Sequence, residues 1–343
     1  MKRDRKFFRP LALIAATATA VTLAGCSADG GGGGDDDENH LSIGTQPTAT
    51  GFTMWLAEEN GYYGDEGLTV EFTYYPSGAA VAEAGITESW DAGVLGSPAA
   101  LTASDKWGLI VAGPNAEESK SQVMWGRTAD FEGKDPADVL RGSEILVKTN
   151  ATQHYSMLAC VEMFGIEDDF TPLTLEPDAI PGAFQSGQGT AAMTWPPFDA
   201  NFVDNPDYMH LCDGAEAGVQ IYNMIGLTPG FVEDRPEQAA SFLVAAYEAN
   251  DFITENPEEA AELLVKFYEE NGVTVSVESA LRELQERSWP SLADSLELYQ
   301  SGAMAEALTS LTDTFVELGA FQDTPDVNML VETGLPVLES ATK

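Results

Sequence analysis

Residues 68–80 read LTVEFTYYPSGAA, and this order of side chains decides the fold. A run rich in β-branched and aromatic residues predicts a strand, Pro76 ends it, and the small residues that follow predict a helix start. The same order returns as LGSPAA at residues 95–100 and as KTNATQHY at residues 148–155. Each place would present unpaired backbone N–H groups and the positive end of a helix dipole at the carboxyl edge of a sheet, where open α/β folds bind ligands. One such place is explained by ordinary helix capping, but three together predict a binding site.

Strand-like and helix-like segments alternate from Leu41 onward, which predicts α/β architecture with largely parallel sheets. Strands are expected at residues 41–45, 68–75, 91–95, 109–112, 122–126, 144–148, 190–194 and 219–225. Helices are expected between them at residues 51–60, 79–88, 98–104, 153–164 and 179–185. After Arg235-Pro236 one helix follows another, with apolar residues at three- and four-residue spacing that predict core-facing stripes, at residues 237–250, 257–271, 277–287, 291–301 and 303–317.

The first 40 residues predict a leader and a linker. A basic head from Lys2 to Arg9 precedes an apolar run that is too short to anchor stably across a bilayer, so residues 1–25 are expected to be a signal peptide. The run ends in Leu23-Ala24-Gly25-Cys26, which resembles the lipobox of bacterial lipoproteins and implies a lipid on the thiol of Cys26. The alternative is a chance cysteine at the end of an ordinary signal peptide. Residues 26–40 contain five consecutive glycines and the acidic run DDDE, which predict a flexible linker.

The charge of the chain excludes some partners. The formal net charge is −40, and the leader carries five basic residues and one acid, so the mature chain has a net charge of −44. Such a surface repels nucleic acid and anionic lipid headgroups. The acidic excess predicts adaptation of a secreted protein to high salt; general solubility of an exported protein is the alternative.

The remaining cysteines and histidines do not form a recognisable metal motif. Cys160 and Cys212 are left after lipidation, and they either pair in an oxidising exterior or stay as buried free thiols. The three histidines, His40, His154 and His210, are scattered along the sequence. The sequence also shows no nucleophile–base pair, so no catalytic residue, metal or cofactor is assigned.

The order and spacing of short motifs resemble a known family. They are IGTQP at residues 43–47, AEENGYY at 57–63, EGLTVEF at 66–72, SGAA at 77–80, WDAG at 90–93, GSPAAL at 96–101, PADV at 136–139, His154-Tyr155, WPPF at 195–198 and NPEEA at 256–260. With these motifs the chain resembles the extracytoplasmic substrate-binding proteins of the nitrate/taurine/aliphatic-sulfonate family of ABC importers.

The resemblance implies an α/β, two-lobed, periplasmic-binding-protein-like type II fold whose cleft closes on one small molecule. Lobe 1 is expected at residues 41–125 and 224–343, the second part being helical, and lobe 2 at residues 126–223. The chain is expected to cross between the lobes near residues 124–127 and 222–225.

The resemblance also implies a ligand site built from both lobes. Lobe 1 would supply Ser77, Gly78 and Ser97, with Gln46 and Trp55 as walls. Lobe 2 would supply Thr149, Asn150, Thr152 and His154, with Trp195 beside them. The family commonly has a glycine followed by Ser or Thr where this chain reads TNAT, so the chain departs from that pattern at residues 149–152.

Three of the candidate residues have structural alternatives. His154 fits a first-turn helix residue that is hydrogen-bonded inside lobe 2. Trp195 fits a core residue, although the Pro-Pro that follows it favours the cleft. Asp199 fits either a partner for a ligand amine or a surface acid.

These observations predict a monomeric, lipid-anchored, extracytoplasmic receptor that delivers a small molecule to an ABC permease in the membrane. The expected ligand is a sulfonate- or nitrate-like anion, a zwitterion or a small heterocycle. The alternatives are an enzyme of the related pyrimidine-biosynthesis type and a sensory lipoprotein that presents its ligand to a receptor.

Because like-charge repulsion at net −44 opposes the compact state, the stability of the mature protein is expected to rise with salt. Thermal unfolding in buffers from low to molar NaCl tests this expectation. A midpoint that stays flat or falls as NaCl increases contradicts the adaptation to high salt.

Overall fold

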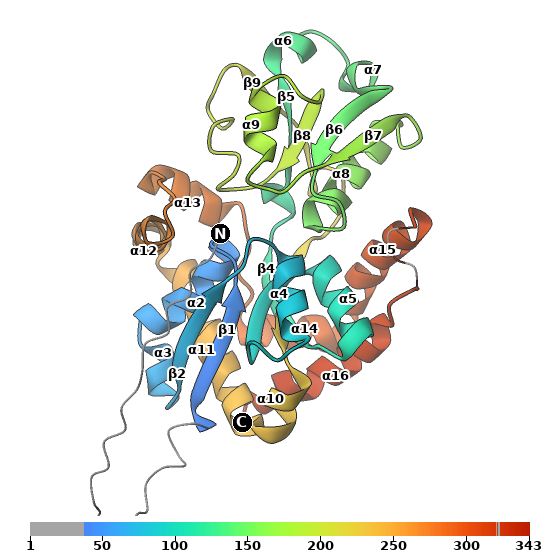
Figure 1. The fold of residues 1–343 in the computed structure, drawn as a ribbon. Coiled ribbons are helices and arrows are strands. Elements are labelled where there is room, and N and C mark those ends of the chain that lie inside the picture. The colour runs from blue at the N-terminus through green and yellow to red at the C-terminus, as the bar shows by residue number, and fades with distance from the viewer. Residues whose placement is uncertain (1–37, 320, 322) are drawn as a thin grey trace, which may run out of the picture.

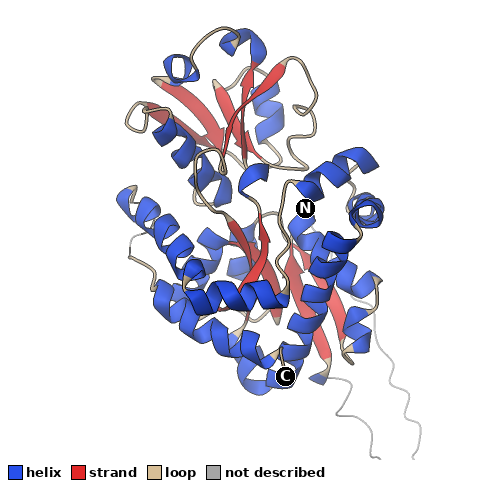
Figure 2. Ribbon diagram, turned by 180° about the vertical axis from the view of Figure 1, so that it is seen from behind, coloured by secondary structure: helices blue, strands red, loops and turns tan. Residues whose placement is uncertain are grey.

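The computed structural model describes residues 38–319, 321 and 323–343, and its two five-stranded sheets are covered by helices (Figures 1 and 2). The sheet of lobe 1 has the order β2 (Thr69–Tyr74), β1 (His40–Thr45), β3 (Ala92–Gly96), β10 (Tyr222–Leu227) and β4 (Ile110–Glu117). The sheet of lobe 2 has the order β7 (Phe170–Thr174), β6 (Ser143–Val147), β8 (Ala191–Thr194), β5 (Val123–Arg127) and β9 (Tyr208–Asp213). The leader and Cys26 lie outside the described residues, and β1 starts at His40, the last residue of the expected linker and one residue before the expected strand.

Helices flank both sheets (Figure 2). Those of lobe 1 are α2 (Ala49–Glu59), α3 (Tyr62–Asp65), α4 (Gly78–Gly85), α5 (Ser97–Trp107), α10 (Pro229–Asp234), α11 (Pro236–Glu255), α12 (Pro257–Glu270), α13 (Val277–Gln285), α14 (Leu292–Ser301), α15 (Ala303–Glu317) and α16 (Val327–Ser340). Those of lobe 2 are α6 (Thr128–Phe131), α7 (Pro136–Leu140), α8 (Thr152–Met163) and α9 (Ile180–Gln185). The stripe on α11 is buried as expected, from Ala239 to Tyr247. Over the described part of the chain, no helix has both the length and the apolar character needed to cross a bilayer.

Each sheet is mixed, which corrects the expectation of largely parallel sheets. In lobe 1, β10 is antiparallel to both β3 and β4, whereas β1 is parallel to β2 and β3. In lobe 2, β5 is antiparallel to both β8 and β9, whereas β6 is parallel to β7 and β8. These antiparallel strands, β10 in lobe 1 and β5 in lobe 2, are each the first strand after the chain arrives from the other lobe. Each begins at the edge of its sheet that faces the other lobe. The four remaining strands of each sheet therefore end at that edge.

The two crossings between the lobes lie a few residues from their expected positions. The chain passes from β4 to β5 through residues 118–122, which include the short 3-10 helix Ser119–Ser121, and it returns from β9 to β10 through residues 214–221. The expected crossings near residues 124–127 and 222–225 instead lie inside β5 and β10. Apolar runs predict that a strand exists, but they do not show to which sheet it pairs.

Besides short helices such as α3, α6 and α10, the sequence did not predict the strands β7 and β9 or the helix α16. The strand β7 reads FTPLT, and Pro172 argues against a strand because proline cannot donate a ladder hydrogen bond. This proline is tolerated because β7 is the edge strand of its sheet. The strand β9 forms the opposite edge, and the helix α16 carries Pro336 in its interior. In each case tertiary pairing or packing outweighs the local pattern.

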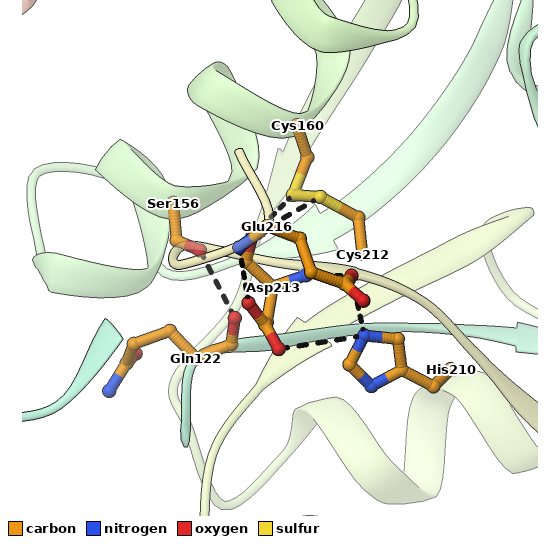
Figure 3. Close-up of a disulfide and its surroundings, with 7 residues drawn as sticks. All are labelled: Gln122, Ser156, Cys160, His210, Cys212, Asp213 and Glu216. Carbon is orange, nitrogen blue, oxygen red and sulfur yellow. Dashed lines mark hydrogen bonds and ion pairs between the residues drawn. A yellow bond between two sulfur atoms is a disulfide. The ribbon is translucent and has the colours of Figure 1, made fainter. Parts of the chain in front are cut away.

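A disulfide joins Cys160 on α8 to Cys212 on β9, which settles the two alternatives left by the sequence (Figure 3). The two cysteines are 52 residues apart, and their Cα atoms are separated by 6.1 Å. Both side chains are fully buried. The bond therefore ties a helix that starts at the inter-lobe edge to the last strand of lobe 2.

A buried carboxyl group lies where lobe 2 packs on α13 of lobe 1. Asp199 is only 3% exposed and shares a narrow hollow with Glu283 and Glu286 of α13. Burial, together with these two carboxylates, raises the pKa of Asp199 to about 8. At the rim of the same contact, Arg282 Nη1 of α13 pairs with Asp204 Oδ2 of lobe 2 at 2.9 Å. Asp199 is therefore a buried contact residue between the lobes and not a surface acid.

Asp199→Asn is expected to stabilise the protein more at pH 8 than at pH 5. The pKa of Asp199 is higher in the folded state than the unfolded value near 3.9, so the folded state holds the proton more tightly, and wild-type stability falls as pH rises from about 4 towards 8. The increase in the free energy of unfolding that Asp199→Asn produces should be larger at pH 8 than at pH 5 by up to about 4 kcal/mol. One pKa unit corresponds to about 1.4 kcal/mol. Urea unfolding at both pH values measures it.

The control is Asp313→Asn, because Asp313 is exposed on α15. It should change stability little at either pH. An equal effect of Asp199→Asn at pH 5 and pH 8 contradicts the assignment of a proton to the buried carboxyl group.

Candidate ligand-binding cleft between the lobes

A cavity of about 390 Å³ lies between the facing carboxyl edges of the two sheets. Its lobe 1 wall consists of residues that follow or end β1, β2, β3 and β4, namely Gln46, Thr48, Thr50, Ser77, Gly78, Ala79, Gly96, Pro98, Ala99 and Glu118, with Asn223 and Arg287 behind them. Its lobe 2 wall consists of Lys148, Thr149, Asn150, Ala151, Thr152, Gln153, Thr174, Pro177 and Trp195, which follow or end β6, β7 and β8. The cavity is large enough for a small molecule.

The start of α4 provides the main donors of the lobe 1 wall. Ser77 caps this helix, with its Oγ accepting from the N–H of Ala80 at 3.3 Å. The N–H groups of Gly78 and Ala79 lie in the first helical turn, where no intrahelical acceptor exists, and no described hydrogen bond uses them. A Cβ at Gly78 would stand 3.3 Å from the backbone N of Gly96. Glycine at this position therefore keeps the two helix starts close together.

Ser97 does not line the cavity. It is 1% exposed, and its hydroxyl donates to the carbonyl oxygen of Tyr222 at the start of β10. Its neighbours Gly96 and Pro98 occupy the wall instead. The hydroxyl is turned into the protein because it satisfies a backbone acceptor where the chain returns from lobe 2.

Thr149, Asn150 and Thr152 line the cavity from lobe 2. Asn150 has a φ of 60°, in the left-handed region that asparagine tolerates better than most residues. The N–H groups of Thr152 and Gln153 open α8 towards the cavity, and no described hydrogen bond uses them. Both lobes therefore direct a helix start at the same space.

The two lobes touch at the edge of the cavity. A Cβ built on Gly96 of lobe 1 would lie 2.7 Å from Cγ2 of Thr152 of lobe 2, and no other non-neighbouring atom would come closer than 3.8 Å. The backbone of Gly96 has φ −66°, which any residue adopts, so glycine is needed here for space alone. This contact exists only while the lobes are together.

His154 lies outside the cavity and is a first-turn helix residue that is hydrogen-bonded inside lobe 2, which was the structural alternative in the sequence analysis. Its Nδ1 accepts a hydrogen bond from the backbone N–H of Asn150 at 3.2 Å, and its ring stacks on Phe315 of α15 with centroids 5.5 Å apart. Burial lowers the pKa of His154 to about 4, so the ring is neutral at pH 7. His154 thus joins α8 of lobe 2 to α15, which reaches towards lobe 2 in Figure 1.

The two tryptophans differ in their positions. Trp195 lines the cavity as expected, and its ring packs edge-on against Phe198 at 5.2 Å. Trp55 does not line the cavity, because it is buried under α12, where its Nε1 donates to Glu270 Oε2 at 3.1 Å and its ring contacts Phe267. Helical periodicity did not show which side of α2 faces α12.

Three polar side chains at the back of the cavity were not expected from the sequence. Glu118 lies in the first crossing, Asn223 is the second residue of β10, and Arg287 follows α13. Arg287 Nε lies 3.6 Å from Glu118 Oε2, and its Nη1 lies 3.4 Å from Glu283 Oε1. A single acid in a chain with 56 acidic residues carries no local signal, so only the packing reveals this group.

The electrostatics of these buried groups are unusual. Burial raises the pKa of Glu118 to about 7 despite the opposing guanidinium of Arg287. Burial also raises the pKa of Glu283, which accepts a hydrogen bond from the hydroxyl of Tyr268 at 2.9 Å. Several buried polar atoms at the cavity have no hydrogen-bond partner among the described residues: Arg287 Nε, Asn223 Oδ1, Gln153 Oε1 and Gln153 Nε2.

A histidine–carboxylate cluster lies elsewhere on lobe 2, beside the disulfide (Figure 3). His210 Nε2 lies 2.9 Å from Glu216 Oε2 and 3.7 Å from Asp213 Oδ2. The backbone N–H of Glu216 donates to Asp213 Oδ1 at 2.8 Å. The three side chains satisfy one another and take no part in the cavity.

Comparisons with known proteins agree with this architecture. The family model described as "NMT1/THI5 like" matches residues 48–260, which is more than half of the chain. The taurine-binding periplasmic protein of Escherichia coli (strain K12) is 27% identical over 196 residues, and the alignment covers 56% of this chain and 59% of that protein. The chain therefore spans less than two thirds of the length of this curated relative.

Solved structures share the fold. The periplasmic aliphatic sulphonate-binding protein of Escherichia coli has a TM-score of 0.68 at 19% identity, covering 85% of this chain and 91% of that one. The periplasmic nitrate-binding protein of Synechocystis PCC 6803 has a TM-score of 0.70 at 14% identity, covering 89% of this chain and 88% of that one. The two-lobed, periplasmic-binding-protein-like α/β fold is thereby confirmed, and the chain belongs to the NMT1/THI5-like family.

Proposed function

We propose that this protein is an extracytoplasmic solute-binding receptor that captures one small molecule between its lobes and delivers it to an ABC permease. The observation that carries the proposal is the cavity at which α4 of lobe 1 and α8 of lobe 2 both begin. Free backbone N–H groups at two helix starts favour an anionic ligand group, and the lining also contains Lys148 and Arg287. The sequence relatives of this chain include a taurine-binding periplasmic protein, which supports the same role.

The mechanism consists of binding and closure. A ligand that contacts both helix starts binds the closed form more tightly than the open form. This difference in affinity raises the fraction of protein molecules in the closed form. Two crossing segments, residues 118–122 and 214–221, connect the lobes and are the only described chain passages between the two sheets. They provide the hinge in this proposal.

The proposed ligand contacts are those predicted residues that line the cavity: Gln46, Ser77, Gly78, Thr149, Asn150, Thr152 and Trp195. Ser97, His154 and Trp55 take supporting positions. Lobe 1 is proposed to comprise the chain before the first crossing and after the second, and lobe 2 the chain between them. The protein is proposed to act as a monomer held at the membrane by a lipid on Cys26.

An enzymatic role is disfavoured by the composition of the cavity. Among the described residues that line it there is no histidine and no cysteine, and Ser77 Oγ is engaged as a helix cap. An activated nucleophile needs a base within hydrogen-bond reach, and no described hydrogen bond joins Ser77 Oγ to a lysine, histidine or carboxylate. A sensory receptor would use the same closure, so it differs from a transport receptor in its membrane partner alone.

Gly96→Ala is expected to weaken ligand binding about tenfold or more, because its methyl group would meet Thr152 Cγ2 and hold the lobes apart. Thr152→Ser removes that methyl group from lobe 2 and keeps the hydroxyl, so the double variant should recover most of the affinity. Calorimetric titration with the compound that co-purifies with the protein, identified by mass spectrometry, measures this. Additive losses in the double variant would disprove that closure brings these residues together.

Trp195→Ala is expected to reduce affinity and to remove most of the ligand-induced change in tryptophan fluorescence, because this indole lines the cavity. Trp55→Phe is the matched control, since Trp55 packs under α12 away from the cavity. The assignment of Trp195 to the binding site is wrong if both variants bind and respond like wild type.

Cys26→Ala is expected to leave the protein unprocessed or release it into the medium, because lipid attachment at this thiol is the proposed anchor. Fractionation of membranes and medium, with mass spectrometry of the mature N-terminus, measures the outcome. A wild-type N-terminus downstream of Cys26 without lipid contradicts the anchor.

A further inference from the structure

Asp199 of lobe 2 lies in a small hollow against lobe 1, outside the ligand cavity. The lobe 2 wall of this hollow lies within residues 196–203, and its lobe 1 wall consists of Val275 and side chains of α13 and its C-terminal end. Its volume of about 10 Å³ is at the lower limit for one water molecule. Because the two walls belong to different lobes, opening of the lobes removes one wall and exposes Asp199 to water.

The carboxyl group of Asp199 has no partner of its own in this closed arrangement. Asp199 is 3% exposed, and its backbone N–H and carbonyl oxygen are paired with Trp195 and Phe202. Among the described residues, none donates a hydrogen bond to its carboxyl oxygens or forms an ion pair with them. A buried carboxylate in this state is unfavourable, and a neutral carboxylic acid is much less so.

The charged groups that face Asp199 come from α13 and the residues at its end: Arg282, Glu283, Glu286 and Arg287. Both arginines are already paired with other acids. Arg282 Nη1 lies 2.9 Å from Asp204 Oδ2, and Arg287 lies between Glu283 and Glu118. Two guanidinium groups therefore face five carboxyl groups when Asp199 is included.

Glu286 does not relieve this excess of acid. Its Oε1 lies 3.9 Å from Arg282 Nε, which is beyond hydrogen-bond distance. On its lobe 2 side it faces Asp213 and His210, of which the acid raises and the imidazole lowers the pKa of Glu286. Closure thus brings an acid of lobe 2 against acids of lobe 1, with no base left over for it among these groups.

A proton removes the unfavourable charge. Burial, together with Glu283 and Glu286, raises the pKa of Asp199 to about 8 in the closed arrangement. An aspartate that is exposed to water has a pKa near 3.9. Between these two pH values the closed form holds a proton that an open form releases. The proton therefore favours closure at low pH, and this contribution is lost as pH rises towards 8.

We propose that the hollow around Asp199 is a proton-binding site between the lobes, so that closure takes up one proton and ligand capture weakens as pH rises. This inference rests on the proposed receptor function, because it needs lobes that open and close. It adds a regulatory site outside the ligand cavity. The volume of the hollow and the two nearby guanidinium groups both oppose a metal cation as its occupant.

The test uses a reporter of closure that needs no added ligand. Gly96→Cys with Thr152→Cys provides it, because these positions touch only while the lobes are together. A Cβ on Gly96 lies 2.7 Å from Thr152 Cγ2 and no closer than 3.8 Å to any other atom of Thr152. The two Cβ atoms are therefore within the range of about 3.5–4.5 Å that a disulfide needs. Equilibration of the dialysed protein in a glutathione buffer gives the effective concentration of the cysteine pair, which rises with the closed fraction.

From pH 6 to pH 7 this effective concentration should fall about tenfold relative to the same cysteine pair combined with Asp199→Asn, since closure binds one proton. Division by the asparagine variant removes the pH dependence of the thiols themselves. Asp168→Asn is the matched control, because Asp168 is an exposed aspartate of lobe 2 beyond the end of α8. It should keep the full pH dependence.

A second measurement follows the proton directly. Carbon-13 NMR of the cross-linked protein, labelled at the aspartate carboxyl carbons, should show one resonance with a titration midpoint of about 8 that is missing in Asp199→Asn. If circular dichroism shows that the cysteine variant is not folded, small-angle X-ray scattering compares wild type with Asp199→Asn. The radius of gyration of wild type should then rise from pH 5 to pH 8, and that of the variant should stay constant.

The proposal is overturned if the Asp199 resonance of the cross-linked protein titrates below pH 5, or if closure depends on pH equally with aspartate and asparagine at position 199. If it is overturned while Gly96→Ala still weakens ligand binding, the receptor function stands and only the proton site is wrong. If closure takes up the proton but native mass spectrometry detects no bound small molecule, the proton site stands and the receptor function is wrong.

Discussion

The direction of β5 and β10 is the constraint on which the arrangement of this protein depends. Each strand is the first in its sheet after the chain leaves the other lobe, and each is antiparallel to both of its neighbours. A strand that enters at the inter-lobe edge forces the other four strands to end there. Every connection that follows β1, β2, β3, β6 and β8 therefore opens into one space, and the helices α4 and α8 begin in it.

The same constraint explains why the lobes can recognise each other when closed. Residues at the two carboxyl edges are close enough for direct contact, as with Gly96 and Thr152, where only hydrogen at the α-carbon leaves room. Away from the cavity, α15 contacts α8 through the ring of His154, which burial keeps neutral, and through the hydrogen bond that Tyr155 shares with Ser310 at 3.0 Å. These contacts stabilise a closed arrangement that a ligand can complete.

The buried charges of lobe 1 are best understood together. The chain has 56 acidic and 16 basic residues, and one of those few bases, Arg287, lies in the interior with Glu118 and Glu283 around it. Burying an ion pair seldom stabilises a fold by itself, and an additional unpaired carboxylate is unfavourable. Sequences most often depart from the rules of folding at functional sites, and Glu118 and Arg287 of this cluster line the cavity. Its unfavourable charge balance is therefore in keeping with a role in recognition.

The amino-acid sequence alone determined the elements and their order, because strand and helix signals are local. Residues such as Pro76, Ser77 and Gly78 show where a strand ends and a helix begins, and the apolar stripe of α11 shows which side faces the core. Local signals also placed most of the loop residues at the cavity, since the ends of parallel strands gather at one edge.

The tertiary structure alone decided which strands pair, where the chain crosses, and which polar groups meet. It turned the hydroxyl of Ser97 inward to a backbone acceptor, covered Trp55 with α12, and paired Cys160 with Cys212 across 52 residues. It also brought Glu118, Asn223 and Arg287 together from three distant segments. Contacts of this kind depend on long-range packing, which no neighbouring residue in the sequence encodes.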